Sequence, residues 1–395
     1  MKNIYSNYNK QLFGFANYTV LIYLFVKGIF MPITIDEAYT FLNYVYVKDY
    51  FNVSIANNHI LNTLLISLTS KISSFELFIR LPNLIFAFIY IYFVNKLIKS
   101  SKKPFLSFCT FIMFPNVLEL FSHARGYGIV FALNFCGLFF FFQNSSKNFK
   151  AYVVTCILFY FGALTLGYNL IVISTFFVFY VRKNSSILKN KYFLLFNSFI
   201  FIASLPLIKI LILNTGNSKP LYGLPNDVSL FYFIKYFFGY SLLLNLNFDF
   251  VYLFISLLLF FLLLKKSYNH EGDFKFMLIL INLQLFLLPL IVNRPLPLLR
   301  LLIPFIPFLI FWIYYYLEDL NIKTKINSFA IYTLFSVLLV NSISKFNIFY
   351  SLIWPNVSRK QIVSKALSND GCEYLFDGGG GIVFEYYLII YNILC

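Results

Sequence analysis

The sequence has little charge for its length, since only 12% of its 395 residues are charged and only 15 are acidic. Apolar residues make up 60% of it, and the mean hydropathy is +0.77. A soluble domain of this length could not bury so much apolar surface, which excludes an ordinary globular enzyme. We therefore predict a multi-spanning membrane protein. The net charge of +16 is dispersed between apolar runs, which indicates cytoplasmic anchors and contacts with anionic lipid, with no nucleic-acid partner.

Other familiar signals are also missing. The five cysteines include no C-x-x-C pair, and only Cys372 and Cys395, in the tail, are candidates for a disulfide, if that tail is extracytoplasmic. The glycine run within 370–381 lacks the lysine and the spacing of a phosphate-binding loop, so we interpret it as a flexible connection. The first apolar run contains Lys27 and no small-residue cleavage site, which predicts an uncleaved anchor.

Long apolar runs dominate what is present. Runs that approach the ~20 residues needed to cross hydrocarbon predict an all-α polytopic protein with about 11 transmembrane helices. Residues 1–345 would form the transmembrane domain, with a first extracytoplasmic loop at 34–77, and residues 346–395 a short extracytoplasmic tail. The shorter apolar segment 59–73 predicts a helix lying at the interface, and 219–247 a second interfacial segment. The expected spans are 12–33, 78–97, 104–121, 126–143, 151–166, 168–182, 192–213, 248–264, 274–292, 299–317 and 326–345.

Lysines orient these spans, because they fall at alternate ends of successive runs. The positive-inside rule places them in the cytoplasm, and the N-terminus with them. The loop at 34–77 and the tail are then extracytoplasmic, in a multi-pass protein of the cell membrane that we expect to be a bacterial inner membrane. The lysines that set this orientation are Lys2, Lys10, Lys96, Lys99, Lys102, Lys103, Lys147, Lys150, Lys183, Lys189, Lys191, Lys265, Lys266, Lys275, Lys323 and Lys325.

Arginine follows a different pattern from lysine. Of six arginines, only Arg182 lies in a lysine-marked loop, and the other five fall on the predicted outer side. Topology does not require positive charge there. The planar guanidinium binds phosphate oxygens through two parallel hydrogen bonds, which lysine does less well, so the pattern indicates a phosphate-bearing ligand at the outer surface. These arginines are Arg80, Arg125, Arg294, Arg300 and Arg359.

The strongest candidate for chemistry is the adjacent pair Asp36 and Glu37, directly after the first apolar run. Carboxylates beside a membrane-spanning segment are costly to maintain, which favours a functional role. In that role one carboxylate is a general base and the other positions a partner or binds a metal. The structural alternative is a solvated loop or a helix cap.

Two of the three histidines, His59 and His123, fall on the same predicted side as this acidic pair. An Asp/Glu/His site for a divalent metal is one interpretation, but no ligand spacing supports it, and we expect no cofactor to be required. An interfacial polar role is the alternative for His59, and contact with lipid headgroups is the alternative for Arg80. Arg125 precedes Gly126 and Tyr127, and glycine allows a ligand or a backbone to approach closely.

Five short segments, which contain the acidic pair, the two histidines and three of the arginines, follow one another along the chain. In this order they resemble the GT-C glycosyltransferases, in particular the branch with protein O-mannosyltransferases and lipid A aminoarabinose transferases. The resemblance implies a polyprenyl-phosphate-linked sugar donor, transfer on the outer membrane face, and Asp36 as base. Two features depart from that pattern, because Ile60-Leu61-Asn62 replaces a pair of prolines after the histidine and the tail is short. The matching segments are Asp36-Glu37-Ala38-Tyr39, Asn58-His59-Ile60-Leu61, Arg80-Leu81-Pro82, Ser122-His123-Ala124-Arg125-Gly126-Tyr127, and Arg300 with Pro304 and Pro307.

The expected reaction is attack of an acceptor hydroxyl or amine on the anomeric carbon, with inversion and departure of the lipid phosphate. The base would be Asp36, and arginines would neutralise the phosphate. The acceptor would be a glycan, a lipid or a protein, reached within membrane lipid. A transporter or flippase for a lipid-linked or anionic solute is the main alternative, although we find no internal inverted repeat. A polymerase of surface polysaccharide repeats is a third, but it would lack the early Asp-Glu pair.

Overall fold

A computed structural model describes residues 2–51, 59–112, 115–144, 148–217, 269–291, 303–320, 325–344, 383 and 385–387. Within these ranges all regular structure is helical, with no strand. Among the described residues, three helices are long and apolar enough to cross a membrane: Lys10–Phe30 within α1 (Lys2–Phe30), α4 (Glu76–Ser100), and Lys191–Lys209 within α10 (Lys191–Asn217). These helices agree with the predicted class of helical membrane protein, whereas the total of about 11 spans stays a prediction.

The remaining helices follow the expected segments closely. The segment 59–73 contains α3, and 104–121 divides into α5 and α6, each of which begins at a proline, the residue favoured in the first turn. The expected segments 219–247 and 248–264 lie outside the described residues. The other elements are α2 (Ile35–Thr40), the π-helix η1 (Phe41–Tyr46), α3 (Ile60–Thr69), α5 (Pro104–Ile112), α6 (Pro115–Leu120), α7 (Tyr127–Gln143), α8 (Phe149–Thr165), α9 (Asn169–Lys183), the 3₁₀ turn η2 (Ser185–Lys189), α13 (Asn269–Ile291), α14 (Ile306–Asp319) and α15 (Lys325–Ser344).

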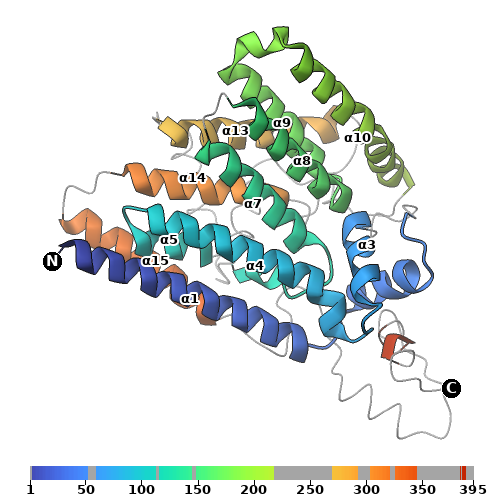
Figure 1. Ribbon diagram of the computed structural model, residues 1–395, viewed down its shortest axis with the longest axis horizontal. Helices are drawn as coiled ribbons and strands as arrows, with labels where there is room; N and C mark the ends of the chain where they lie inside the picture. The colour runs from blue at the N-terminus through green and yellow to red at the C-terminus, as the bar shows by residue number, and fades with distance from the viewer. Residues whose placement is uncertain are drawn as a thin grey trace, which may run out of the picture.

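Helix α7 forms the centre of the bundle. It packs along α8 on one side and α4 on another, and α4 in turn packs along α1 (Figure 1). Almost every side chain of α7 is buried, as expected for a helix that is apolar on all faces. The Tyr90 ring of α4 stacks against Phe121 and meets Phe131 and Phe135 of α7 edge-on, while its hydroxyl donates to the Phe111 carbonyl.

Buried amides join the helices inside this apolar bundle. Asn17 of α1 donates to the Asn95 side chain of α4 at 2.7 Å. Asn134 of α7 donates to Asn169 of α9 at 2.6 Å and to the Pro304 carbonyl at 2.8 Å. Side-chain amides often bond across helices in membranes, where an unsatisfied polar group is costly. They fix the register between helices whose apolar surfaces alone would allow sliding.

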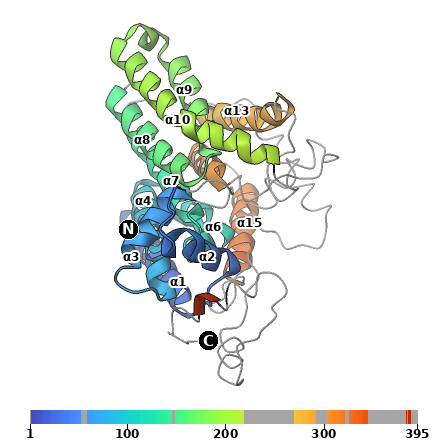
Figure 2. The same cartoon turned by 90° about the vertical axis from the view of Figure 1, so that its right-hand side faces the viewer.

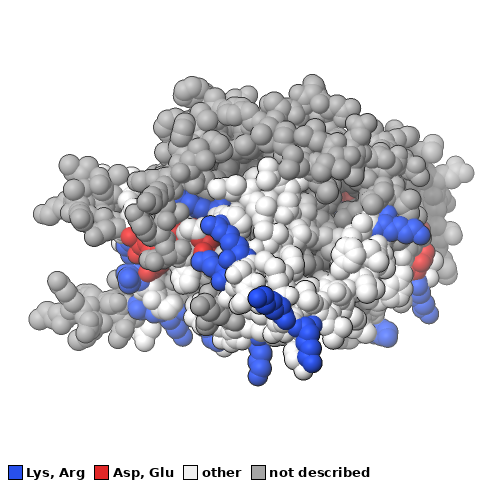
Figure 3. Space-filling view, turned by 90° about the horizontal axis from the view of Figure 1, so that it is seen from above, with Lys and Arg blue, Asp and Glu red and all other residues white. Residues whose placement is uncertain are grey.

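The short helices gather at one end of the bundle. Elements α2 and α3 lie at the end of the bundle where residues 385–387 of the tail also lie, and α3 contacts α8 (Figures 1 and 2). A view from above shows Lys and Arg along the borders of the uncharged described surface (Figure 3). Val383, Tyr386 and Tyr387 of the tail pack against the segment that contains α2, while the side of the membrane on which Asp36 and the tail lie stays a prediction.

This arrangement generates a test of topology. A reporter fused after Lys103 or Lys325 is expected to be cytoplasmic, whereas one fused after Asn58 or at Cys395 is expected to be extracytoplasmic, because the lysine-rich ends stay inside. Paired phosphatase and fluorescent-protein fusions measure both sides. A cytoplasmic signal from the Asn58 fusion would contradict the assignment of Asp36 and Glu37 to the outer face.

Candidate functional site

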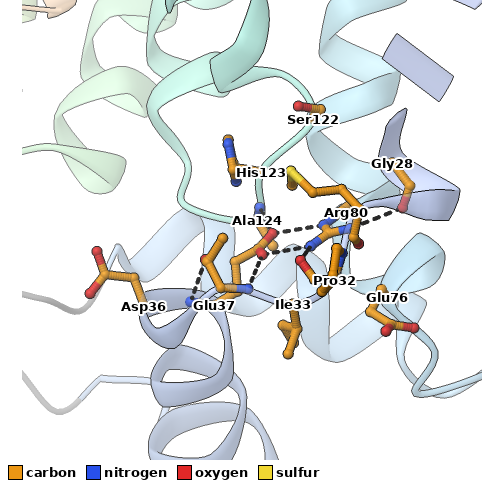
Figure 4. A network of polar contacts seen from close by, with 12 residues as sticks. Gly28, Pro32, Ile33, Asp36, Glu37, Glu76, Arg80, Ser122, His123 and Ala124 are labelled. Atoms are coloured by element: carbon orange, nitrogen blue, oxygen red, sulfur yellow. Dashed lines mark hydrogen bonds and ion pairs between the residues drawn. The ribbon is translucent and has the colours of Figure 1, made fainter. Parts of the chain in front are cut away.

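The acidic pair lies on α2, and a capping box begins this helix. The Thr34 amide donates to Glu37 Oε2 at 2.8 Å, and the Glu37 amide donates to Thr34 Oγ1 at 3.4 Å. The T-x-x-E spacing of the sequence dictates this cap. Because consecutive helical residues are about 100° apart, the two carboxylates point in different directions. Figure 4 shows Glu37 directed toward Arg80 and Asp36 directed away from it.

Arg80 of α4 forms a two-pronged ion pair with Glu37. Its Nε lies 2.8 Å from Oε1 and its Nη2 lies 2.7 Å from Oε2, and both side chains are fully buried. The three remaining N–H groups donate to the carbonyls of Gly28, Met31 and Pro32, at 3.1, 2.6 and 2.9 Å. All five donors of the guanidinium are thus engaged. Arg80 therefore fixes the chain that leaves α1 against α4.

Glu37 is equally saturated. Besides the two bonds from Arg80, it accepts from the Thr34 amide and, at 2.7 Å, from the Ala124 amide. Burial would raise the pKa of Glu37, but the charge and hydrogen bonds of Arg80 outweigh it, with smaller help from His123, and lower the pKa from 4.5 to about 2. Glu37 is ionised at neutral pH, and its geometry is that of a structural anchor.

The Ala124 contact holds the loop that carries Arg125. The Ala124 carbonyl accepts from Asn62 Nδ2 of α3 at 2.9 Å, and Asn62 Oδ1 accepts from Asn83 of α4 at 3.0 Å. Gly126 follows with φ of +74°, and a Cβ there would lie 2.6 Å from a Thr165 methyl group. Only glycine fits this close, left-handed position. The loop therefore presents Arg125 in one orientation.

Arg125 reaches Asp36 from this loop. Its Nη2 lies 3.4 Å from Asp36 Oδ2, and its Nη1 lies 3.3 Å from the Asp36 carbonyl and 3.4 Å from Thr40 Oγ1. These distances exceed the 2.7–2.9 Å of a tight charge-assisted bond. The Asp36 side chain is 23% exposed, whereas that of Arg125 is 1% exposed. The second carboxylate–arginine pair is therefore looser than the first and open to solvent on its acidic side.

Tyr127 and His59 lie next to Arg125, so that Asp36, Arg125, Tyr127 and His59 form a row of neighbouring side chains. The Arg125 guanidinium carbon lies 6.0 Å from the centre of the Tyr127 ring, and the His59 ring meets the same tyrosine edge-on at 5.0 Å. His59 Nδ1 lies 2.7 Å from the Thr165 carbonyl. Because a carbonyl only accepts, Nδ1 carries a proton. His59 thus joins the start of α3 to the end of α8.

A third cluster consists of Lys27, Glu119 and His123. Glu119 Oε2 lies 3.5 Å from Lys27 Nζ, and Glu119 Oε1 lies 3.1 Å from His123 Nε2, with all three side chains buried. Glu119 was not identified as a candidate from the sequence, because it lies within the expected span 104–121. A carboxylate inside an apolar run, four residues before a histidine, was a usable signal for this ion cluster.

Seven of the nine candidate residues are therefore described. Asp36, Arg125, Tyr127 and His59 form one row, Glu37 and Arg80 form the adjoining buried pair, and His123 belongs to the third cluster. Only Asp36 among these seven is partly exposed. Arg294 and Arg300 lie outside the described residues, as does Arg359. Within the described chain, no group of three or more His, Cys, Asp or Glu side chains is placed to hold a metal ion.

Comparison with known proteins identified no relative of this chain. No protein-family model, curated protein or solved structure matches the chain. The residues and their contacts therefore carry the functional argument.

The anchor generates a stability test. Glu37→Gln leaves the buried Arg80 charge uncompensated, which we expect to cost about 3–5 kcal/mol. Asp36→Asn, one residue away and partly exposed, is the matched comparison and should melt close to wild type. Thermal melting of detergent-purified protein measures both, and equal melting of Glu37→Gln and wild type would contradict the anchor.

The same pair sets a pH dependence. Because the pKa of Glu37 falls from 4.5 to about 2 on folding, its contribution to stability is complete above about pH 4.5 and is lost as the pH falls through about 2. Melting temperatures of wild type and Glu37→Gln should therefore converge as the solution is acidified.

Proposed function

We propose that this protein is a membrane glycosyltransferase of the GT-C kind, which transfers a sugar from a polyprenyl-phosphate donor to an acceptor on the outer membrane face. One observation carries the proposal. The two adjacent carboxylates of α2 are each paired with an arginine from another segment, and one pair is saturated and fully buried while the other is long and partly exposed. The loose pair, Asp36 with Arg125, has the freedom to exchange its partner for a substrate.

Asp36 has the properties of a general base in this reaction. Asp36 is the one candidate in the described row that solvent reaches, and a positioned carboxylate can take a proton from an attacking group. The acceptor oxygen or nitrogen gives its proton to Asp36 as it forms the bond to the anomeric carbon. The carbon–oxygen bond to the lipid phosphate breaks with its electron pair, and inversion follows from attack opposite the leaving group.

Arg125 is the group best placed to receive the phosphate. Its forked donors are held rigidly by the loop, and such preorganised donors stabilise charge that develops on a leaving group. Arg80 differs, because Glu37 and three carbonyls occupy all of its donors. We therefore assign Arg80 to the anchor and keep Arg294 and Arg300 as further proposed phosphate ligands.

Tyr127 and His59 complete the proposed substrate site. Their rings lie beside Arg125, where they would contact the sugar or the prenyl phosphate. His123 is assigned to support the loop through Glu119. No metal or other cofactor is needed for these steps, since the base and the phosphate donors are side chains of the protein. The partners would be the lipid-linked sugar, membrane lipid, and a glycan, lipid or protein acceptor.

A transporter or flippase of a lipid-linked or anionic solute is the second candidate. The observation that favours it is the buried Lys27, Glu119 and His123 cluster, because ionisable side chains inside helical membrane proteins often mark ion or proton pathways. The enzyme explains the exposed Asp36 better. Substrate movement without sugar transfer in proteoliposomes would favour the transporter.

The base assignment is tested by Asp36→Asn, which keeps the shape of the side chain. Transfer should fall by about 10²–10⁴-fold while donor binding and melting survive, because general-base contributions have this size. Sugar transfer from a synthetic prenyl-phosphate donor is the measurement. Asp49→Asn, at an exposed position after η1, is the matched control and should transfer normally. Normal turnover by Asp36→Asn would make the acidic residue structural.

The phosphate assignment is tested at Arg125. Arg125→Ala should weaken donor binding by about 10- to 100-fold, since hydrogen bonds to charged groups contribute about 1.5–3 kcal/mol. Arg125→Lys should bind better than the alanine variant but less well than wild type, because it keeps the charge and loses the fork. Arg182→Ala, on α9, removes an arginine that lies over Phe276 and serves as control. Wild-type binding by both Arg125 variants would remove the phosphate argument.

A further inference from the structure

The end of the chain packs against the helix that carries the acidic pair. Val383, Tyr386 and Tyr387 are buried in an apolar cluster with residues of the first loop and of the segments around it, although more than 250 residues separate them in sequence. The cluster also contains Ile33, Ala38, Phe41, Leu42, Val45, Ile66, Ile79 and Ala124. Both ribbon views place this segment beside the short helices (Figures 1 and 2).

Tyr387 makes two polar contacts here. Its hydroxyl accepts from the Ile33 amide at 3.2 Å and donates to Glu76 Oε1 at 2.9 Å. Ile33 directly precedes Thr34, the cap of α2, and Glu76 begins α4, one turn before Arg80. A single hydroxyl thus joins the chain entering the acidic helix to the helix that supplies its arginine.

Tyr386 strengthens the same contact from the other side. Its hydroxyl donates to the Ser74 carbonyl at 2.9 Å, and its ring meets Phe41 edge-on at 5.5 Å. Phe41 directly follows the last residue of α2. The two tyrosines therefore contact the chain before α2 and the chain after it.

Helix α2 has six residues and continues directly into the six residues of η1, so its helical segment is short and depends on such contacts. A helix this short is not stable alone, and tertiary packing must determine its position. The Glu37 and Arg80 pair holds one side of α2. The tyrosines bind its ends, at Ile33 and at Phe41.

We propose that Tyr387, supported by Tyr386, is a positioning residue that sets α2 and hence Asp36 for the reaction. The inference rests on the proposed function only where it names the reaction. The contact itself, between a C-terminal tyrosine and the start of the acidic helix, is testable without any transfer assay.

The test is Tyr387→Phe, which removes only the hydroxyl. Amide hydrogen exchange is expected to become faster in peptides covering residues 33–40, since the Ile33 amide loses its acceptor, while α7 keeps its protection. The kcat of sugar transfer should fall by about 10- to 100-fold with little change in the KM for the donor. The reason is that a misplacement of Asp36 by ~1 Å can cost about 10² in rate. Tyr46→Phe, at an exposed position of η1, is the matched control and should change neither readout.

The outcomes separate this inference from the proposed function. Unchanged exchange over 33–40 in Tyr387→Phe overturns the inference, whatever the wild-type activity. Faster exchange with unchanged kcat overturns the positioning role and leaves a purely structural contact. Faster local exchange with a lower kcat and wild-type melting supports it. If wild-type protein transfers no sugar, the proposed function fails, and exchange still decides whether Tyr387 positions α2.

Discussion

The ion pair between Glu37 and Arg80 is the interaction on which the rest of this end of the molecule depends. Glu37 binds the start of α2 and the Ala124 loop, while Arg80 binds the last carbonyls of α1 and the residues that follow it. Three segments distant in sequence thus meet at two side chains. Desolvating two charges is costly, and the pair offsets that cost because every donor of Arg80 is bonded and Glu37 accepts four hydrogen bonds.

The saturated pair gives its neighbour a different role. Asp36 is one residue away, but its helix position turns it toward solvent and toward Arg125 on a loop that Glu37 itself holds. The two adjacent carboxylates therefore differ in how tightly they are paired and in exposure because their surroundings differ. Glu37 is fixed and its pKa is lowered to about 2, whereas Asp36 keeps a looser partner and access to solvent. The proposed reaction would use both properties, because the anchor holds α2 in place while Asp36 stays accessible to a substrate.

The sequence predicted the helical membrane class and most of the described helix positions, while the functional roles of residues 36 and 37 stay predictions. It could also have predicted that the two carboxylates point in different directions, since the T-x-x-E cap implies a helix, in which successive residues are about 100° apart. It could not show that Arg80 is an internal partner, because an arginine at the end of an apolar run reads equally well as a phosphate ligand or a lipid contact. The contacts of Tyr386 and Tyr387 carried no local signal, because they join positions more than 300 residues apart.

The third cluster explains why the loop tolerates so much buried charge. Glu119 faces Lys27 of α1 and His123 of the loop, so the loop is tied to α1 through one carboxylate and to α2 through another. The positive charges of Lys27 and Arg80 balance the negative charges of Glu119 and Glu37. A charge-balanced set loses less on burial than an isolated ion would, and its geometry has few alternatives once one member is placed. The ion pair between Arg125 and Asp36 can then be long, because the contacts of Glu37 and Glu119 already fix where the loop lies.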